Sequence, residues 1–487
     1  MVGPDYKRPD WSSPISWLSG KQPVAKPVAS SLVADPVDVE WWTLFHDPVL
    51  TGLEKRVAGE NLDLKVAGFR LAQSRAQVAN AQSYLLPTLG GNASFARQLP
   101  SANGLFALVP GAAGGSAASG AAGTSTGGLT GAFQPFNVYQ GGLDASWEVD
   151  LWGGVQRSVE AASATADAAV ETQRSVLLSS LAEVAHDYIL LRGVQTELRI
   201  ANDNVRTARE SLSLTQQRAA GGVTTDLDVA NASAQLRTTL ARIPSLTQQE
   251  AQMINALSLL LGQPPNALRD VLATAKPVPP VPPRVPVGIP SELARRRPDI
   301  RQAEAQLHAA TAGIGVAEAN FYPSLSLTGS IGLQSLYTHN LFNVNSEQYA
   351  AGPGLTIPIF QGGQLRAMLH LREAQQQEAA LNFQKTVLGA WHDVDNAMTA
   401  YRAEQDRRDE LIQAVAENQR ALSLAQSRYQ QGVADFLTVL VAESSLLAAQ
   451  LQLADSTTTV SSNLVALYKA LGGGWQTDMP DTPVTKS

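Results

Sequence analysis

The chain contains one long unit twice, and this repeat limits the possible folds more than any other feature of the sequence. The segment Leu212–Val223 recurs as Leu422–Val433, an offset of 210 positions. Earlier in the unit the offset is 236, as from Ala67 to Ala303. The difference between 236 and 210 places 26 additional residues in the first copy, between Pro87 and Leu212. Two copies of one unit predict a single repeated architecture, although the length alone would suggest several domains.

Composition excludes several classes of function. The formal charge is −7, which offers no electrostatic basis for binding nucleic acid. The sequence has no cysteine, so it predicts no disulfide and no thiolate metal site. It has no run of 18 or more apolar residues, which excludes an ordinary transmembrane helix but not a transmembrane β-barrel, whose strands give weaker signals. No export signal is visible after Met1, which is consistent with a signal removed before this numbering begins.

No motif for catalysis or for a cofactor stands out. The six histidines form no pair four residues apart. His392 is followed by Asp393 and Asp395, but neighbouring positions on a helix point in different directions, so a solvated helix face is the better interpretation. Nucleophile elbows, phosphate loops and zinc spacings are absent from the sequence. We therefore expect no metal, no cofactor and no enzyme activity.

Each copy is expected to contain a helix, a β-hairpin, a very long helix and a return helix. We divide the chain into an extended N-terminal segment (1–48), repeat 1 (49–264), a Pro-rich linker (265–290), repeat 2 (291–474) and a C-terminal tail (475–487). Within repeat 1 we expect a helix over 49–86, a hairpin over 91–150, a long helix over 155–220 and a return helix over 226–261. The hairpin, long helix and return helix of repeat 2 are expected over 324–359, 363–431 and 436–471.

The strands are recognised by apolar residues at every second position. In the first hairpin these are Leu143, Ala145, Trp147 and Val149, and the second hairpin has a similar series from Leu325. Near the end of the second hairpin Pro358 indicates a strand end or a bend. Residues 99–134 are rich in Gly, Ala, Ser and Thr and predict a mobile loop, which holds the additional residues of the first copy.

The two long helices are unusual. Each covers about 65 residues and would span roughly 100 Å at a rise of 1.5 Å per residue. Frequent alanine and sparse aromatic residues favour helices packed closely side by side.

Four amphipathic strands per chain imply an assembly. Strand edges cannot remain unpaired in lipid, so the strands must close into a barrel, and bacterial barrels begin at about eight strands. Two chains would supply eight strands with a filled interior, and three would supply twelve, enough for a pore. Symmetry alone does not choose between three and four chains. The alternative is an isolated soluble helical protein with two short hairpins.

Several stretches resemble a known family. They are Gly3–Pro9, Trp42–Pro48, Ser146–Gly153, Arg296–Glu304 and Leu422–Leu440, and together they extend over the whole chain. They resemble the TolC-like outer membrane factors of tripartite efflux pumps, in the lipoprotein branch found with resistance-nodulation-division transporters. The resemblance implies a mainly α fold with a transmembrane β-barrel: a homotrimer with a 12-stranded barrel in the outer membrane of a Gram-negative bacterium and a periplasmic α-helical barrel. The Pro-rich linker and the chain ends would form a belt around its waist.

The same resemblance implies partners and sites. The partners would be a periplasmic adaptor, an inner-membrane resistance-nodulation-division transporter and outer membrane lipid. A lipid anchor is implied too, although this sequence has no cysteine to carry it. The adaptor would dock at the two turns between the long helices and the return helices. These turns comprise Gly222, Val223, Thr224, Gly432, Val433 and Ala434. The simpler interpretation is that each glycine only ends a helix.

A periplasmic aperture is expected beside these turns. Its candidate residues are Asp226, Leu227, Asp228, Asp435, Leu437 and Glu443. The carboxylates would form an acidic ring that favours cations, or they would only stabilise the starts of helices; the leucines would form a hydrophobic constriction instead. Related proteins carry a carboxylate and an arginine where this chain has Val441 and Ser444.

Three aromatic residues, Trp147, Trp152 and Phe360, lie near the junctions of strands and helices. They are candidates for a girdle at the membrane interface, and the alternative is local packing.

The function best supported at this level is a passive exit duct for small toxic compounds. A duct for type I protein secretion is an alternative within the same architecture, and a helical surface scaffold is an alternative outside it. An enzyme is the least supported class. The exported compounds are not indicated by the sequence, since the resemblance implies that the pump selects them.

Overall fold

The computed structural model describes residues 1–9, 30–99 and 135–479. Residues 100–134, predicted as a loop, and most of the predicted tail lie outside the described residues. The described chain divides into two compact units, and each takes segments from both repeats. The strand unit comprises Met1–Tyr6, Ala76–Ser163 and Ala309–Gln376, and the helical unit comprises Lys7–Arg75, Ala164–His308 and Gln377–Ser487.

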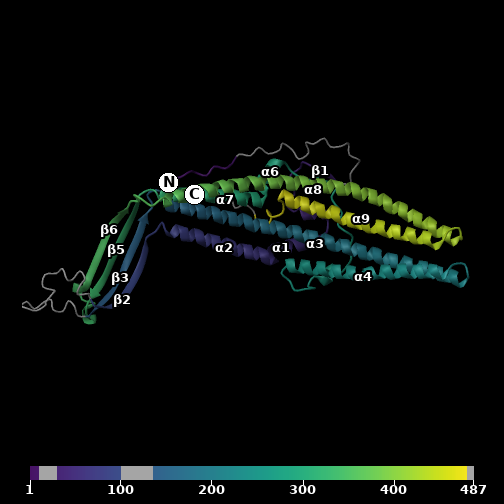
Figure 1. The fold of residues 1–487 in the computed structure, drawn as a ribbon, viewed down its shortest axis with the longest axis horizontal. Coiled ribbons are helices and arrows are strands. Elements are labelled where there is room, and N and C mark those ends of the chain that lie inside the picture. Colours follow the sequence, from purple (N-terminus) through teal and green to yellow (C-terminus); the bar gives the residue numbers. More distant parts are fainter. Residues whose placement is uncertain (10–29, 100–134, 480–487) are drawn as a thin grey trace, which may run out of the picture. The chain divides into compact units, whose positions relative to one another are not determined.

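The strand unit contains one four-stranded antiparallel sheet, in the order β2-β3-β5-β6 (Figure 1). The strands are β2 (Thr88–Gln98), β3 (Phe136–Val149), β5 (Ser324–Ser335) and β6 (Glu347–Thr356). The first hairpin begins at Thr88 rather than at the predicted Gly91, because the ladder extends to the pair Thr88 and Ser146. Pro358 lies beyond β6, which ends at Thr356.

The sheet has one apolar and one polar face in its central strands. Leu143 on β3 lies opposite Ile331 on β5, and the next residue, Asp144, lies opposite Ser330. Successive residues of a strand point to opposite faces, so the apolar pair and the polar pair lie on different sides. Within the described residues, the outer strands β2 and β6 each pair with a single strand.

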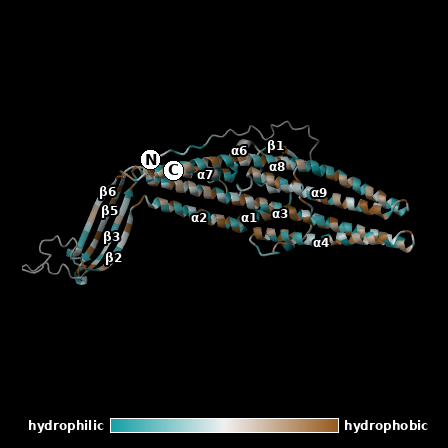
Figure 2. Ribbon diagram, in the orientation of Figure 1, coloured by the Kyte–Doolittle hydropathy of each residue, from teal (hydrophilic) through white to brown (hydrophobic). Residues whose placement is uncertain are grey.

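The helical unit is built around two pairs of long helices. Figure 1 shows α4 (Asp226–Leu260) beside α3 (Gly154–Ala220), and α9 (Phe436–Leu471) beside α8 (Gln364–Gln430). Helices α3 and α8 have 67 residues each, which corresponds to roughly 100 Å. Helix α4 continues through Pro244. Figure 2 shows that polar and apolar residues are mixed along all four helices.

The predicted helix over 49–86 is wrong in one respect, because the structure has two helices there, α1 (Pro48–Glu60) and α2 (Leu62–Ser83). Asn61 separates them with an extended backbone, at ψ 129°. Its side-chain oxygen accepts a hydrogen bond from the amide of Leu64 at 2.9 Å, and its side-chain amide donates to the carbonyl of Leu260 at 2.9 Å. A residue that caps one helix and contacts the end of another interrupts the helix without proline or glycine.

Short elements complete the description. The predicted linker contains α5 (Arg269–Leu272) and β4 (Arg284–Pro286), and β4 pairs in parallel with β1 (Ser31–Val33). The other short elements are the 3₁₀ helices η1 (Trp41–Phe45), η3 (Thr338–Asn340) and η4 (Val344–Ser346), and the α-helix α6 (Pro290–Arg296). Helix α7 (Pro298–Ala319) follows α6 and has 22 residues, as α2 does.

The main core of the helical unit joins segments that are distant in the sequence. Trp41 is fully buried and stacks on Tyr468, with ring centres 5.4 Å apart. Its indole nitrogen donates to the carbonyl of Gly473 at 3.1 Å. Trp475 is buried too, with the guanidinium of Arg174 4.4 Å from its ring centre. The first part of the predicted tail is therefore core.

Among the described residues, α9 alone is long and apolar enough to cross a membrane by composition. Core helices satisfy the same criterion. The C-terminal half of α9 contributes buried residues, among them Val460, Leu464 and Tyr468, to the main core. We therefore interpret α9 as a core helix.

Candidate functional site at the two helical turns

The first turn joins α3 to α4 by a left-handed glycine. Gly222 has φ 74°, which glycine adopts without the strain that a Cβ causes. Its amide donates to the carbonyl of Ala219 at 2.9 Å, and the amide of Val223 donates to that of Arg218 at 2.9 Å. These bonds satisfy carbonyl groups at the helix end.

The second turn, from α8 to α9, has the same geometry. Gly432 has φ 74°, its amide donates to the carbonyl of Tyr429 at 3.0 Å, and the amide of Val433 donates to that of Arg428 at 2.9 Å. A Cβ added to Gly222 or Gly432 would meet nothing within 4 Å. Val223 and Val433 are 65% and 64% exposed. Both turns therefore present an exposed valine beside open space.

The helices after the turns begin with side-chain caps. Thr225 and Asp228 form a reciprocal capping box at the start of α4, and Asp228 also accepts a hydrogen bond from the Thr224 hydroxyl. That hydroxyl is the main reason why the pKa of Asp228 lies below its usual value. On α9, Asp435 accepts from the amide of Thr438 at 3.2 Å and from its hydroxyl at 2.7 Å. The hydrogen bond from the Thr438 side chain likewise lowers the pKa of Asp435.

The structure does not place Glu443 with these carboxylates. Its side chain is 6% exposed and accepts a hydrogen bond from the hydroxyl of Ser211 on α3. Burial raises the pKa of Glu443 above its usual value. The sequence-based grouping of Glu443 with the aperture therefore needs correction, because its position on α9 turns it toward α3.

Large apolar side chains are exposed near the turns, among polar ones. Leu227 is 68% exposed, Leu437 56% and Val441 57%. Leu437 and Val441 are four residues apart and therefore lie on the same side of α9. Asp226 and Ser444 are exposed too, and Ala434 is half-buried.

One contact at this end of the helical unit joins the two copies directly. Arg218, in the last turn of α3, donates to the carbonyl of Tyr429 at 3.0 Å and to that of Gln430 at 3.3 Å. Its guanidinium lies 4.6 Å from the centre of the Tyr429 ring. Tyr429 in turn packs edge-on against Phe436, with centres 5.6 Å apart. We call Arg218, Tyr429 and Phe436 the tip joint.

Sequence reasoning missed the tip joint, although a signal was present. Arg218 recurs as Arg428 at the repeat offset of 210, but the alanine after Arg218 is replaced by Tyr429 in the second copy. The joint is backed by a small apolar cluster that includes Ala232, Leu422 and Leu446.

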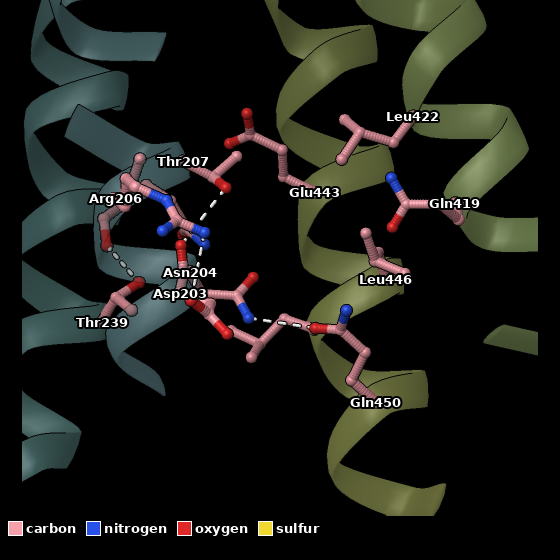
Figure 3. A pocket seen from close by; sticks show the side chains of 13 residues that line it. Asp203, Asn204, Arg206, Thr207, Thr239, Gln419, Leu422, Glu443, Leu446 and Gln450 are labelled. Carbon is pink, nitrogen blue, oxygen red and sulfur yellow. Dashed lines mark hydrogen bonds and ion pairs between the residues drawn. The ribbon is translucent and has the colours of Figure 1, made fainter. Parts of the chain in front are cut away.

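Behind the joint the four long helices enclose a polar pocket of about 100 Å³ (Figure 3). In it the side-chain amide of Asn204 on α3 donates to Gln450 on α9 at 3.0 Å. Arg206 pairs with Asp203 at 3.1 Å, and Glu443 also lines the pocket. Amides and hydroxyls thus occupy positions between helices that are otherwise rich in alanine and leucine.

The three candidate aromatic residues lie in the strand unit and differ in their contacts. The indole of Trp147 donates to the carbonyl of Leu85 at 3.1 Å. That of Trp152 donates to the carbonyl of Pro323 at 2.8 Å, and its ring stacks on Tyr322 at 4.6 Å. Phe360 is 87% exposed. Contacts with residues distant in the sequence hold both tryptophans, whereas the ring of Phe360 is exposed.

The part of the chain that the structure describes has no group of three or more His, Asp or Glu side chains able to hold a metal ion.

Comparison with known proteins gives consistent results. A family model described as outer membrane efflux protein matches residues 54–263 and 289–473. The toluene efflux pump outer membrane protein TtgI of Pseudomonas putida is 33% identical over 97% of this chain and 95% of its own. The pyoverdine export outer membrane protein OpmQ of Pseudomonas putida is 34% identical over 96% and 93%. Among solved structures, the outer-membrane channel OprN matches with a TM-score of 0.84 and 31% identity, over 98% of this chain and 99% of that one.

Proposed function

Since the chain belongs to the outer membrane efflux protein family and is an outer membrane efflux channel, we propose that three copies form the complete exit duct of a tripartite pump. It lies in the outer membrane of a Gram-negative bacterium. The family is one of efflux channels and not of enzymes. The duct is passive: an inner-membrane resistance-nodulation-division transporter drives export, and a periplasmic adaptor connects the two.

The observation that carries this proposal is the four-stranded sheet, in which the outer strands β2 and β6 each leave one edge unpaired among the described residues. Backbone groups at a sheet edge are unsatisfied in lipid, so these strands must pair with strands of other copies. Three copies supply twelve strands, whereas two would supply eight and leave only a filled interior. The periplasmic wall would consist of the long helices α3, α4, α8 and α9.

Two measurements on the purified protein test the duct. Its mass in detergent, corrected for bound detergent by light scattering, should be that of three chains. Inserted into planar bilayers, the same preparation should conduct ions. A folded protein that is monomeric, or a trimer that never conducts, would contradict the proposal.

The adaptor is proposed to dock at the turns Gly222–Thr224 and Gly432–Ala434. The exposed valines and the open space beside both glycines support this. Val433→Asp should abolish drug resistance while the trimer remains intact. Val271→Asp, on a valine that is 53% exposed outside both turns, is the matched control and should retain resistance. Full resistance of the Val433 variant would refute docking at this turn.

The aperture is proposed to consist of Asp226, Leu227, Asp228, Asp435 and Leu437. Exposed leucines and carboxylates next to the turns support a narrow opening that is apolar and weakly cation-selective. Glu443 is buried and would not line the opening. It would support the aperture indirectly, by holding α9 against α3.

The cargo is proposed to be small toxic organic compounds. The relatives named for toluene efflux and for pyoverdine export support small molecules as a class. Deleting the gene and measuring growth against a panel of solvents and antibiotics tests this. Unchanged tolerance together with loss of a secreted protein would favour a type I secretion duct instead.

An N-terminal lipid anchor is included in the proposal, although this sequence has no cysteine. The first residues belong to the strand unit: the amide of Val2 donates to the carbonyl of Trp152 at 3.0 Å, and Arg157 pairs with Asp5 at 2.6 Å. This contact keeps the chain start close to the membrane-spanning strands. Incorporation of labelled palmitate into protein expressed from its native gene tests the anchor.

A further inference from the structure

The sheet contains an interface between the two copies that is defined residue by residue. Thr88 pairs with Ser146 in the first hairpin, and Ser324 pairs with Thr356 in the second. Thr88 and Ser324 differ by 236 positions, and Ser146 and Thr356 differ by 210. These are the two offsets of the sequence repeat, so the hairpins correspond position by position. Between them, β3 of the first copy pairs with β5 of the second.

We infer that β6 of one chain pairs with β2 of a second copy in the register that β3 and β5 use within the chain. This rests on the proposed trimer, in which those two strands meet. Adding 210 to a residue of β3 and subtracting 236 from its partner on β5 gives the new pair. Ser146 opposite Thr328 thus becomes Thr356 opposite Asn92 of the partner subunit.

Gly352 supports this register, because no contact within the single chain requires a glycine at that position. A Cβ on Gly142 would approach the carbonyl oxygen of Ile331 to 2.7 Å and the Cα of Gly332 to 2.9 Å, so β5 requires glycine there. Its equivalent on β6 is Gly352, where a Cβ would meet nothing within 4 Å. Glycine weakens a strand interior and often marks the close approach of another backbone. The proposed register supplies that backbone, opposite Gly352.

The repeat is not perfect at this point. The residue of β2 that corresponds to Gly332 is Ala96, so one member of the new pair carries a methyl group. The two strands should therefore approach each other less closely at Gly352 and Ala96 than at Gly142 and Gly332. A Cβ at Gly332 would lie 2.7 Å from the backbone carbonyl oxygen of Gly141, so the methyl group of Ala96 requires the two backbones to move apart at this pair.

The apolar faces of β6 and of the partner's β2 lie on the same side of the sheet in this register. It places Ala93 opposite Leu355 and Phe95 opposite Pro353, all on the apolar side of the sheet. Phe95 and Leu355 are 59% and 63% exposed in the single chain. A shift by one residue would turn one strand's apolar side chains to the polar face. A shift by two residues leaves every side chain on its original face, so the faces do not distinguish these registers. The repeat offsets select one of them.

Disulfide cross-linking tests the register. Because the sequence has no cysteine, Asn92→Cys with Thr356→Cys introduces two thiols only. Opposed Cα atoms lie about 4.5–5.5 Å apart, within disulfide range. In one chain β2 and β6 are separated by two strands, about 14 Å in all, so an intrachain bond is excluded. Oxidation should link most chains into covalent dimers and trimers that a reductant separates.

Two register controls make the test decisive. Asn92→Cys with Gly354→Cys, and Ser94→Cys with Thr356→Cys, correspond to slips by two residues. Each slip moves one Cα by about 7 Å along the strand, beyond disulfide range, so neither pair should cross-link. Stronger cross-linking of a slipped pair would overturn the inference.

The mass of each variant separates this inference from the proposed trimer. A trimeric mass without cross-linking at Asn92 and Thr356 overturns the register and leaves the trimer standing. A monomeric or dimeric mass of folded protein overturns both. A trimer that cross-links only at the proposed pair supports both.

Discussion

The guanidinium of Arg218 donates to the backbone carbonyl of Tyr429 at 3.0 Å and lies 4.6 Å from the centre of the Tyr429 ring. This contact joins the end of α3 to the end of α8, one helix from each copy. A cation near the carbonyls at a helix C-terminus is favourable, and the aromatic ring adds to the attraction. The tip joint therefore holds together the two turns at which the adaptor is proposed to dock.

Replacing Arg218 with alanine should loosen both turns. A hydrogen bond from a charged group contributes about 1.5–3 kcal/mol, and a partly exposed cation–π contact about 0.5–1 kcal/mol. We expect a local loss of roughly 2 kcal/mol, because the joint is half-buried. Amide hydrogen exchange in residues 214–225 should then accelerate by at least tenfold.

Arg428→Ala is the matched control for that experiment. Arg428 is the repeat equivalent of Arg218, but its side chain is exposed and makes no hydrogen bond or ion pair with the described residues of the same chain. Equal acceleration of exchange around the first turn in both variants would contradict a specific role for the joint.

The buried carboxyl of Glu443 predicts a pH dependence of stability. Burial raises its pKa in the folded protein above the ordinary value near 4.5. The neutral form is therefore favoured on folding, so its contribution is fully present below the unfolded pKa and is lost as pH rises through the folded pKa. Glu443→Gln keeps a neutral hydrogen-bonding group and should remove this loss. Its melting temperature relative to the wild type should be higher at pH 8 than at pH 4.

A comparison of Glu443→Gln with the wild type at both pH values can also contradict this prediction. If the difference in melting temperature between Glu443→Gln and the wild type were identical at both pH values, the buried carboxyl would have no role in the pH dependence.

Removing charge beside the turns should reduce cation selectivity. Asp226→Asn with Asp435→Asn leaves the cap of α9 in place, because asparagine caps helices as well as aspartate does. The reversal potential of single channels in a salt gradient should move toward that of an unselective pore. Glu378→Gln, on an exposed carboxylate of α8 far along the chain from both turns, is the control. Unaltered selectivity in the double variant would exclude these carboxylates from the aperture.

A bulky residue at Gly352 should impair assembly and not the folding of the single chain. Nothing within 4 Å would contact a Cβ there, so Gly352→Val is tolerated inside one chain. In the trimer the side chain would meet the backbone of the partner's β2 strand. The fraction of trimer in detergent should fall several-fold, whereas Ala350→Val on the same strand should change it less. A normal yield of trimer from the Gly352 variant would argue against the close approach.

Much of the fold could be predicted because its signals are local or repeated. The return helix at Phe436–Leu471 has the predicted limits, and α8 differs from its prediction by a single residue at each end. Glycine at 222 and 432 marks helix ends through its own backbone preference, which needs no knowledge of neighbours. The resemblance to efflux channels likewise rested on stretches of sequence, and the comparisons confirm it.

The site itself could be predicted only in part. The turns were located correctly in the sequence, but the burial of Glu443 was not foreseen, since it depends on Ser211, far away in the chain. The break at Asn61 was missed too: its cap on the amide of Leu64 is a local contact that an asparagine can indicate, whereas its hydrogen bond to the carbonyl of Leu260 forms only on folding. No period or composition in the local sequence reports such a contact.

The sequence by itself determined the repeat, the order of helices and strands, the two turns and the family, because each depends on residue types at fixed spacings along the chain. Only the tertiary structure decided that Arg218 meets Tyr429, that Glu443 faces inward, and that Trp147 and Trp152 donate to carbonyls 62 and 171 positions away in the chain. Those contacts join residues that the chain brings together only on folding, and their energies depend on distance in space and on burial.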